Sequence, residues 1–202
     1  MKSEGRNPKP EGNPKAEIRV ASSPQGLRST TADVRRFTFV AIGSNLGDRH
    51  QNVTRAMARL AELSDQPLLK SSLYETQPVD CPPGSPPFVN AVVGLMPRPD
   101  ETPESLLARL QALERESGRQ RKKALNEPRP LDLDLIAFGG ERRATAELTL
   151  PHSRAHQRRF VLEPLSELAP KLILPGQVRT VAELLCYVIG AQSSSAASTS
   201  SG

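Results

Sequence analysis

The sequence predicts an α+β fold with a ferredoxin-like βαββαβ core and short C-terminal additions. Apolar runs of strand length alternate with segments of helical apolar period, in the order strand, helix, strand, strand, helix, strand. That order is typical of the ferredoxin-like motif. Pro, Gly, Ser and charged residues dominate the two ends of the chain, which confines the core to its middle.

The first half of this core contains two strands and a helix. The apolar run at 37–42 predicts a buried strand, and the Gly-rich turn GSNLGD follows it. A helix then begins near Asp48, and residues 68–76 predict the second strand. The apolar face of the helix consists of Val53, Met57, Leu60 and Leu63.

The second half begins with a loop, because the segment 77–87 is too rich in proline for regular structure. Residues 88–96 predict the third strand. Thr102 and Pro103 are suited to the N-cap and the first turn of a second helix, and Gly118 is suited to its C-terminal end. The apolar stripe of this helix consists of Leu106, Leu110 and Leu113.

Residues 131–138 predict the fourth strand, and helical runs near 160–168 and 180–188 form the C-terminal additions. The chain is therefore predicted to divide into a disordered basic Pro-rich arm, a folded domain and a disordered Ser/Ala-rich tail, at 1–36, 37–188 and 189–202.

Composition and charge exclude several classes of protein. No apolar stretch approaches the roughly 20 residues that span a membrane, and the N-terminus lacks the apolar region of a secretory signal. The chain carries a net charge of +5, of which +4 lies in residues 1–36, so the folded part is nearly neutral. We expect a monomeric cytoplasmic protein that binds small molecules, with no nucleic-acid or membrane partner.

Two aspartates, Asp132 and Asp134, stand in the apolar run that predicts the fourth strand. Asp is a residue that strands avoid, and side chains at i and i+2 project from one face about 6–7 Å apart. A half-buried strand with its polar face in water is one interpretation. Binding of a divalent cation is the other, because carboxylate oxygens suit hard cations such as Mg²⁺.

Basic residues on both sides of this strand favour the cation interpretation. Arg129 lies three residues before Asp132, the run GRQRKK occupies 118–123, and the segment 150–160 adds two histidines and three arginines. Arginine holds phosphate oxygens in planar, bidentate contacts. Carboxylates and arginines together indicate Mg²⁺ and a polyphosphate, although the sequence contains no P-loop motif.

Five separate motifs, in order along residues 37–188, resemble the family of 6-hydroxymethyl-7,8-dihydropterin pyrophosphokinase of folate biosynthesis. They are FVAIGSNLGD, SSLYETQPV, PPFVNAVVGL, RPLDLDLIAFG and LTLPHSRAHQRRFVLEPLSELAP. The fourth motif is close to the family signature R-x-x-D-[LIV]-D-[LIVM]-[LIVM]. The resemblance implies the ferredoxin-like fold and an enzyme that transfers a pyrophosphoryl group from ATP to the hydroxymethyl oxygen of the pterin, releasing AMP.

The resemblance also assigns residues to the phosphate end of the site. Asp132 and Asp134 would hold two Mg²⁺ ions that bridge the phosphates of ATP. Arg119, Arg129 and Arg158 would contact phosphates as the catalytic residues. The residues assigned to the remainder of ATP are Gln111, Glu114, Arg121, Leu148 and His152.

At the pterin end, the resemblance implies that Asn90 hydrogen-bonds the ring edge and that Phe88 and Phe160 stack on the ring faces. Ordinary core packing is the alternative for both phenylalanines. The residues that would complete the slot are Gly43, Thr76, Gln77 and Val79.

Two positions depart from the family pattern. Phe88 stands where a Tyr is common, and Asn126 stands where the family has a Trp in the loop before the signature. Two other functions remain compatible with the fold. The basic arm suggests a nucleic-acid-binding module, although strand aromatics that stack bases are missing. A non-catalytic relative would have lost Asp132, Asp134 or Arg129, and all three are present.

Overall fold

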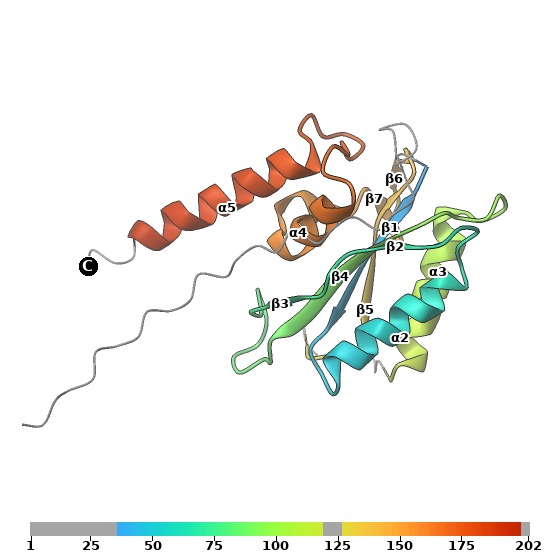
Figure 1. Cartoon of the computed structure of the whole chain (residues 1–202), viewed down its shortest axis with the longest axis horizontal. Helices are drawn as coiled ribbons and strands as arrows, with labels where there is room; N and C mark the ends of the chain where they lie inside the picture. Colours follow the sequence, from blue (N-terminus) through green and yellow to red (C-terminus); the bar gives the residue numbers. More distant parts are fainter. Residues whose placement is uncertain (1–35, 119–126, 199–202) are drawn as a thin grey trace, which may run out of the picture.

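The fold consists of an antiparallel sheet with helices on both faces (Figure 1). The computed structural model describes residues 36–118 and 127–198. The strands of the sheet are β1 (Thr38–Ser44), β2 (Leu69–Lys70), β3 (Tyr74–Thr76), β4 (Phe88–Leu95) and β5 (Asp132–Phe138). The helices are α2 (Arg49–Ala61), α3 (Pro103–Glu116), the 3₁₀ helix η1 (Ala155–Gln157), α4 (Arg159–Leu168) and α5 (Val181–Ser198).

Strand order within the sheet is β2-β4-β1-β5, and β3 also pairs with β4. All of these pairs are antiparallel. The central strand β1 therefore lies between β4 and β5, which are distant from each other in the sequence. This arrangement shows the expected α+β class and brings three of the quoted motifs side by side.

One face of the sheet is covered by α2 and α3 (Figure 1). The predicted N-cap of α3 is confirmed, and α2 begins near Asp48 as predicted. The Asp48 side chain accepts a hydrogen bond from the backbone N–H of Gln51 at 3.0 Å. Thr102 Oγ1 accepts one from Ser105 N at 3.1 Å, and Gly118 follows α3 with a φ of +88°. The core on this face includes Val40, Ile42, Leu60, Leu106, Leu110, Leu133 and Leu135.

The opposite face is covered by α4, and α5 packs against α4 on the side away from the sheet (Figure 1). These elements enclose a second core. This core includes Phe39, Val92, Ile136, Leu162, Leu165 and Leu184. Leu133 and Leu135 of β5 belong to the α2/α3 core, and successive side chains of a strand point to opposite faces. Asp132 and Asp134 therefore lie on the α4 side of the sheet.

The predicted strand at 68–76 is interrupted, and β2 and β3 pair separately with β4. Ser71 lies at the interruption. Its backbone N–H donates to Val92 O at 3.0 Å, and its hydroxyl Oγ accepts from Val92 N at 2.9 Å. A hydroxyl that takes the place of a backbone carbonyl disrupts the regular ladder at this point.

The C-terminal part differs from the prediction in two respects. α5 continues to Ser198, so the predicted disorder is wrong for residues 189–198. Alanine is the strongest helix former, and its presence among the serines offsets their weaker propensity. A short hairpin, β6 (Arg143–Ala144) with β7 (Thr149–Leu150), was not predicted. The predicted arm at 1–36, apart from Arg36, and the last four residues lie outside the described residues.

Membrane insertion was not expected, and no helix in the described ranges has the length and apolar character that crossing a bilayer requires. The longest of these helices, α5, contains serine and glutamine in its second half.

Candidate active site

Strand register places three predicted site residues next to one another. Gly43 of β1 is opposite Asn90 of β4 on one side and Asp132 of β5 on the other. A Cβ atom on Gly43 would lie 3.2 Å from Asn90 Oδ1 and 3.7 Å from the Phe88 ring. Glycine is therefore needed here because its neighbours approach closely, and the bare backbone leaves space above it.

A cavity of about 290 Å³ opens above Gly43, on the α4 side of the sheet. All seven residues predicted for the pterin end line it, as do both aspartates and two of the three predicted arginines. These residues are Gly43, Thr76, Gln77, Val79, Phe88, Asn90, Phe160, Asp132, Asp134, Arg129 and Arg158. Residues predicted from separate motifs thus share one cavity.

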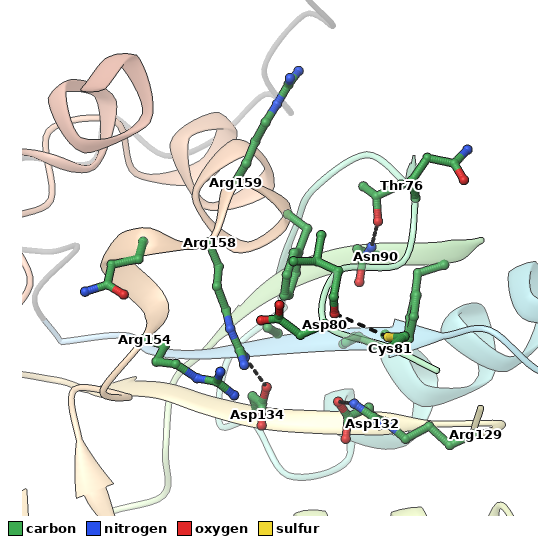
Figure 2. Close-up of a pocket in the computed structure, with 18 of the residues that line it drawn as sticks. Thr76, Asp80, Cys81, Asn90, Arg129, Asp132, Asp134, Arg154, Arg158 and Arg159 are labelled. Carbon is green, nitrogen blue, oxygen red and sulfur yellow. Dashed lines mark hydrogen bonds and ion pairs between the residues drawn. The ribbon is translucent and has the colours of Figure 1, made fainter. Parts of the chain in front are cut away.

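Each aspartate of the pair faces an arginine (Figure 2). Arg129 Nη2 lies 2.5 Å from Asp132 Oδ2, and Arg158 Nη1 lies 3.7 Å from Asp134 Oδ2. Both pairs are partly buried, with 16–17% of the side-chain surface exposed in the first and 21–34% in the second. Arg129 Nε is buried and has no hydrogen-bond partner among the described residues.

Burial and like charge perturb the titration of this end of the cavity. Burial, followed by the charge of Asp132, raises the pKa of Asp134 above its ordinary value. Burial lowers the pKa of His152, which lies near the same carboxylates. Burial, followed by the charge of Arg154, lowers the pKa of Arg158. A bound cation would therefore stabilise the ionised carboxylate pair, and a bound anion would stabilise the charged arginines.

Aromatic and amide groups form the other end of the cavity. Asn90 Nδ2 donates to Thr76 Oγ1 at 2.7 Å, which fixes the amide orientation and directs Asn90 Oδ1 toward Gly43 (Figure 2). Phe88 and Phe160 are half-buried and line the cavity. The Arg129 guanidinium lies 5.9 Å from the centroid of the Phe88 ring, within cation–π range.

Asn45, which the sequence did not single out, connects the two loops beside the cavity. It lies in the turn after β1 and is fully buried. Its Oδ1 accepts from Arg129 N at 2.8 Å, and its Nδ2 donates to Pro86 O at 3.4 Å. The turn GSNLG therefore positions Arg129 through the Asn45 side chain. The sequence signal that could have indicated this role is an Asn between two glycines in a turn that follows a strand.

Several further cavity residues were not predicted individually. Asp80 and Cys81 belong to the Pro-rich loop, and Asp80 has a φ of +54°. Arg154 and Arg159 were noted only as part of a basic run. Gln192 comes from α5, a helix predicted to be shorter. The complete set of unpredicted lining residues is Ala41, Ile42, Asp80, Cys81, Arg154, Gln157, Arg159 and Gln192.

Four of the residues predicted for the remainder of ATP are described by the structure, and none of the four lines this cavity. Gln111 is exposed on α3, and Leu148 is buried in the α2/α3 core. Glu114 is buried, and its Oε1 accepts from Leu133 N at 2.8 Å. His152 lies at the edge, where its Nδ1 accepts from Arg154 N at 3.3 Å. Arg119, Arg121 and Asn126 lie outside the described residues.

The fold and this cavity define a class of protein: an α+β enzyme domain that presents a carboxylate pair and arginines beside a flat polar-aromatic slot. Within that class the chain belongs to the 7,8-dihydro-6-hydroxymethylpterin-pyrophosphokinase family, whose model matches residues 39–170.

Relatives agree with this membership. A Haemophilus influenzae protein named 2-amino-4-hydroxy-6-hydroxymethyldihydropteridine pyrophosphokinase is 38% identical over 138 residues, covering 68% of this chain and 84% of that one. A Porphyromonas gingivalis protein of the same name is 40% identical over 138 residues, covering 66% and 91%.

A solved structure, described as HPPK-DHPS in complex with substrates, supports the fold. It superposes with a TM-score of 0.58 at 12% identity. The match covers 77% of this chain and 43% of that chain, so this chain spans less than half of the solved protein.

Proposed function

We propose that this chain transfers a pyrophosphoryl group from ATP to the hydroxymethyl group of 6-hydroxymethyl-7,8-dihydropterin, releasing AMP, in folate biosynthesis. Family membership supports this reaction. The observation that carries it is the convergence in one cavity of the Asp132/Asp134 pair, two arginines and a polar-aromatic slot.

The slot suits a flat heterocycle. Phe88 and Phe160 provide apolar surface for the ring faces, while Asn90 and Thr76 provide hydrogen-bonding groups at its edge. The Gly43 backbone forms the floor, where a side chain would meet the Asn90 amide. We propose that the pterin ring lies here, with its hydroxymethyl group directed toward the aspartates.

At the phosphate end, Arg129 and Arg158 would bind phosphate oxygens and hold the triphosphate of ATP for in-line attack at the β-phosphorus. Arg129 Nε is a buried donor with no partner among the described residues, which suits it to an incoming oxygen. The Arg158–Asp134 contact of 3.7 Å is long for a hydrogen bond, so Arg158 can turn to a phosphate at little cost. In phosphoryl transfer, positioning and charge stabilisation supply most of the rate.

The Asp132/Asp134 pair fits Mg²⁺ by its donor chemistry. Two carboxylates on one strand face are hard oxygen ligands, and burial, followed by the charge of Asp132, raises the pKa of Asp134. The described residues contain no group of three or more His, Cys, Asp or Glu side chains placed to hold a metal ion. Mg²⁺ commonly uses one or two carboxylates, with water and substrate phosphates as its other ligands. We propose that the pair holds two Mg²⁺ ions, which would neutralise charge on the ATP phosphates.

We also propose that the core is ferredoxin-like and that the enzyme acts as a monomer. If β2 and β3 are counted as one interrupted strand, the sheet order is second, third, first, fourth, with α2 and α3 on one face. The residues proposed for the pterin and for the phosphates line one cavity, which is compatible with a site that a single chain completes. The cytoplasmic location stays a prediction.

The test is release of AMP from ATP in the presence of Mg²⁺ and 6-hydroxymethyl-7,8-dihydropterin. Mass spectrometry of the pterin product should show the added diphosphate. Reactions without pterin, and reactions with excess EDTA, provide the controls. AMP release no faster than in the pterin-free control would refute the proposed reaction.

A further inference from the structure

One arginine of the cavity wall, Arg154, has no role in the mechanism so far. It lies at the N-terminal end of η1 and lines the cavity. In Figure 2 its guanidinium group extends toward the Arg158 guanidinium and the Asp134 carboxylate. We propose that Arg154 is an additional phosphate-binding residue of the nucleotide site, which forms a two-arginine clamp with Arg158. This inference rests on the proposed function.

Charge pairing distinguishes Arg154 from the other arginines of this cavity. Arg129 pairs with Asp132, and Arg158 faces Asp134. No carboxylate lies within ion-pair distance of the Arg154 guanidinium in residues 36–118 and 127–198, where the backbone N–H of Arg154 donates to His152 Nδ1. Arg154 therefore contributes a positive charge that the described part of the protein does not neutralise.

The neighbouring residue Arg159 provides the contrast. It also lines the cavity, but its guanidinium contacts both carboxylate oxygens of Glu163 at 3.2 Å. In Figure 2 its side chain extends away from the aspartates. Arg154 and Arg159 thus carry the same charged group and line the same cavity. They differ because the charge of Arg159 is paired with Glu163.

The backbone holds Arg154 firmly despite the exposure of its side chain. His152 N donates to Ile136 O of β5 at 2.9 Å, and Ala155 N donates to His152 O at 3.0 Å. Ala155 itself is fully buried. Arg154 is thus fastened to the strand that carries the aspartates, and its guanidinium reaches the cavity from a fixed position.

A phosphate chain is the ligand that this arrangement fits. Two guanidinium groups that face the same space repel each other, and an anion between them removes the repulsion. Guanidinium groups match phosphate oxygens in a planar fork. The pterin alcohol carries no phosphate, so Arg154 should act on the nucleotide and leave pterin binding unchanged.

The test is isothermal titration calorimetry, in which α,β-methylene-ATP is added to the protein in the presence of Mg²⁺. It compares the wild-type chain with Arg154→Gln, Arg154→Lys and Arg159→Gln. This analogue is inert because transfer breaks the bond between the β-phosphorus and the oxygen that bridges to the α-phosphorus. We expect Arg154→Gln to bind about 10- to 100-fold more weakly. The affinity of Arg154→Lys for the analogue should lie between those of Arg154→Gln and the wild-type chain, since lysine keeps the positive charge and loses the planar fork of donors. For Arg159→Gln we expect a change of less than about threefold.

Two further readouts separate binding from folding and from the reaction itself. The Kd for the pterin and the melting temperature should be unchanged in both Arg154 variants, while kcat/KM for ATP falls with analogue affinity. Equal analogue affinity in Arg154→Gln and Arg159→Gln, or a matching loss of pterin affinity, would overturn the inference. If wild-type protein binds the analogue but releases no AMP, the proposed reaction fails, and the calorimetric comparison still decides the role of Arg154.

Discussion

Neutralising Asp134 should stabilise the protein and abolish its activity. Burial and the charge of Asp132 raise the pKa of Asp134 even though Arg158 stands beside it. The ionised carboxylate is therefore less favourable in the folded than in the unfolded chain. The substitution Asp134→Asn keeps the shape of the side chain and removes the charge.

The magnitude follows from the geometry of the strand. Two charges about 6.5 Å apart repel by about 2.5 kcal/mol at an effective dielectric constant of about 20, and by about 0.6 kcal/mol in water. The Arg158–Asp134 pair is partly exposed at 3.7 Å, and pairs of this kind stabilise by about 0–1 kcal/mol. The raised pKa shows that the unfavourable contributions are larger. We expect Asp134→Asn to raise the free energy of unfolding by about 1 kcal/mol, which corresponds to a rise of about 2–4 °C in Tm.

The gain should depend on pH with a defined sign. A carboxyl whose pKa is raised by folding stabilises the folded state below the unfolded value of about 3.9. That contribution is lost as pH rises through the folded pKa. Wild type and Asp134→Asn should therefore melt alike near pH 3.5, and the variant should melt higher at pH 7 in EDTA.

Thermal melting at both pH values, with and without Mg²⁺ and α,β-methylene-ATP, is the assay. Wild type should gain Tm with ligand, and Asp134→Asn should gain much less. Asp100→Asn provides a matched control because Asp100 is exposed and lies away from the cavity. If Asp134→Asn melts lower than wild type at pH 7, or keeps wild-type turnover, the electrostatic argument is wrong.

Three other predictions concern single features. Glu114→Ala should lower the free energy of unfolding, measured with urea, by about 1–3 kcal/mol because the buried Leu133 N–H loses its acceptor. Glu114→Gln should lower it less. Asn45→Ala should cost a similar amount and lower kcat about tenfold, since Arg129 N loses its partner; full activity would show that Asn45 does not position Arg129. Deletion of residues 2–35 should leave KM for both substrates within about twofold, because this segment has no apolar period with which to join the core.

Sequence periodicity predicted the part of the fold that depends on local chemistry. The start of α2 near Asp48 and the N-cap of α3 at Thr102 were located correctly, and each is marked by a side-chain hydrogen bond that spans three residues. The shared orientation of Asp132 and Asp134 was also predicted from local pattern, because strand alternation alone places residues i and i+2 on one face. The family motifs then indicated which distant residues would meet.

Long-range partners explain what the sequence did not predict. Ser71 interrupts its strand through hydrogen bonds with Val92 of β4, 21 residues away. Glu114 was assigned to ATP, but its carboxylate lies beneath β5 and binds Leu133 N. Neither contact has a local signal, since each depends on a partner that only the assembled sheet provides.

The two aspartates are tolerated in β5 because the strand divides its stabilising and its chemical roles between its two faces. Leu133 and Leu135 are buried in the α2/α3 core, and burying such side chains stabilises by about 1.5–3 kcal/mol each. That burial exceeds the repulsion of about 2.5 kcal/mol at most between Asp132 and Asp134 on the other face. A one-residue slip against β1 would exchange the faces and bury both charges. The same pattern that makes the site therefore also fixes the register, and a variant with Leu133→Asp should fail to fold.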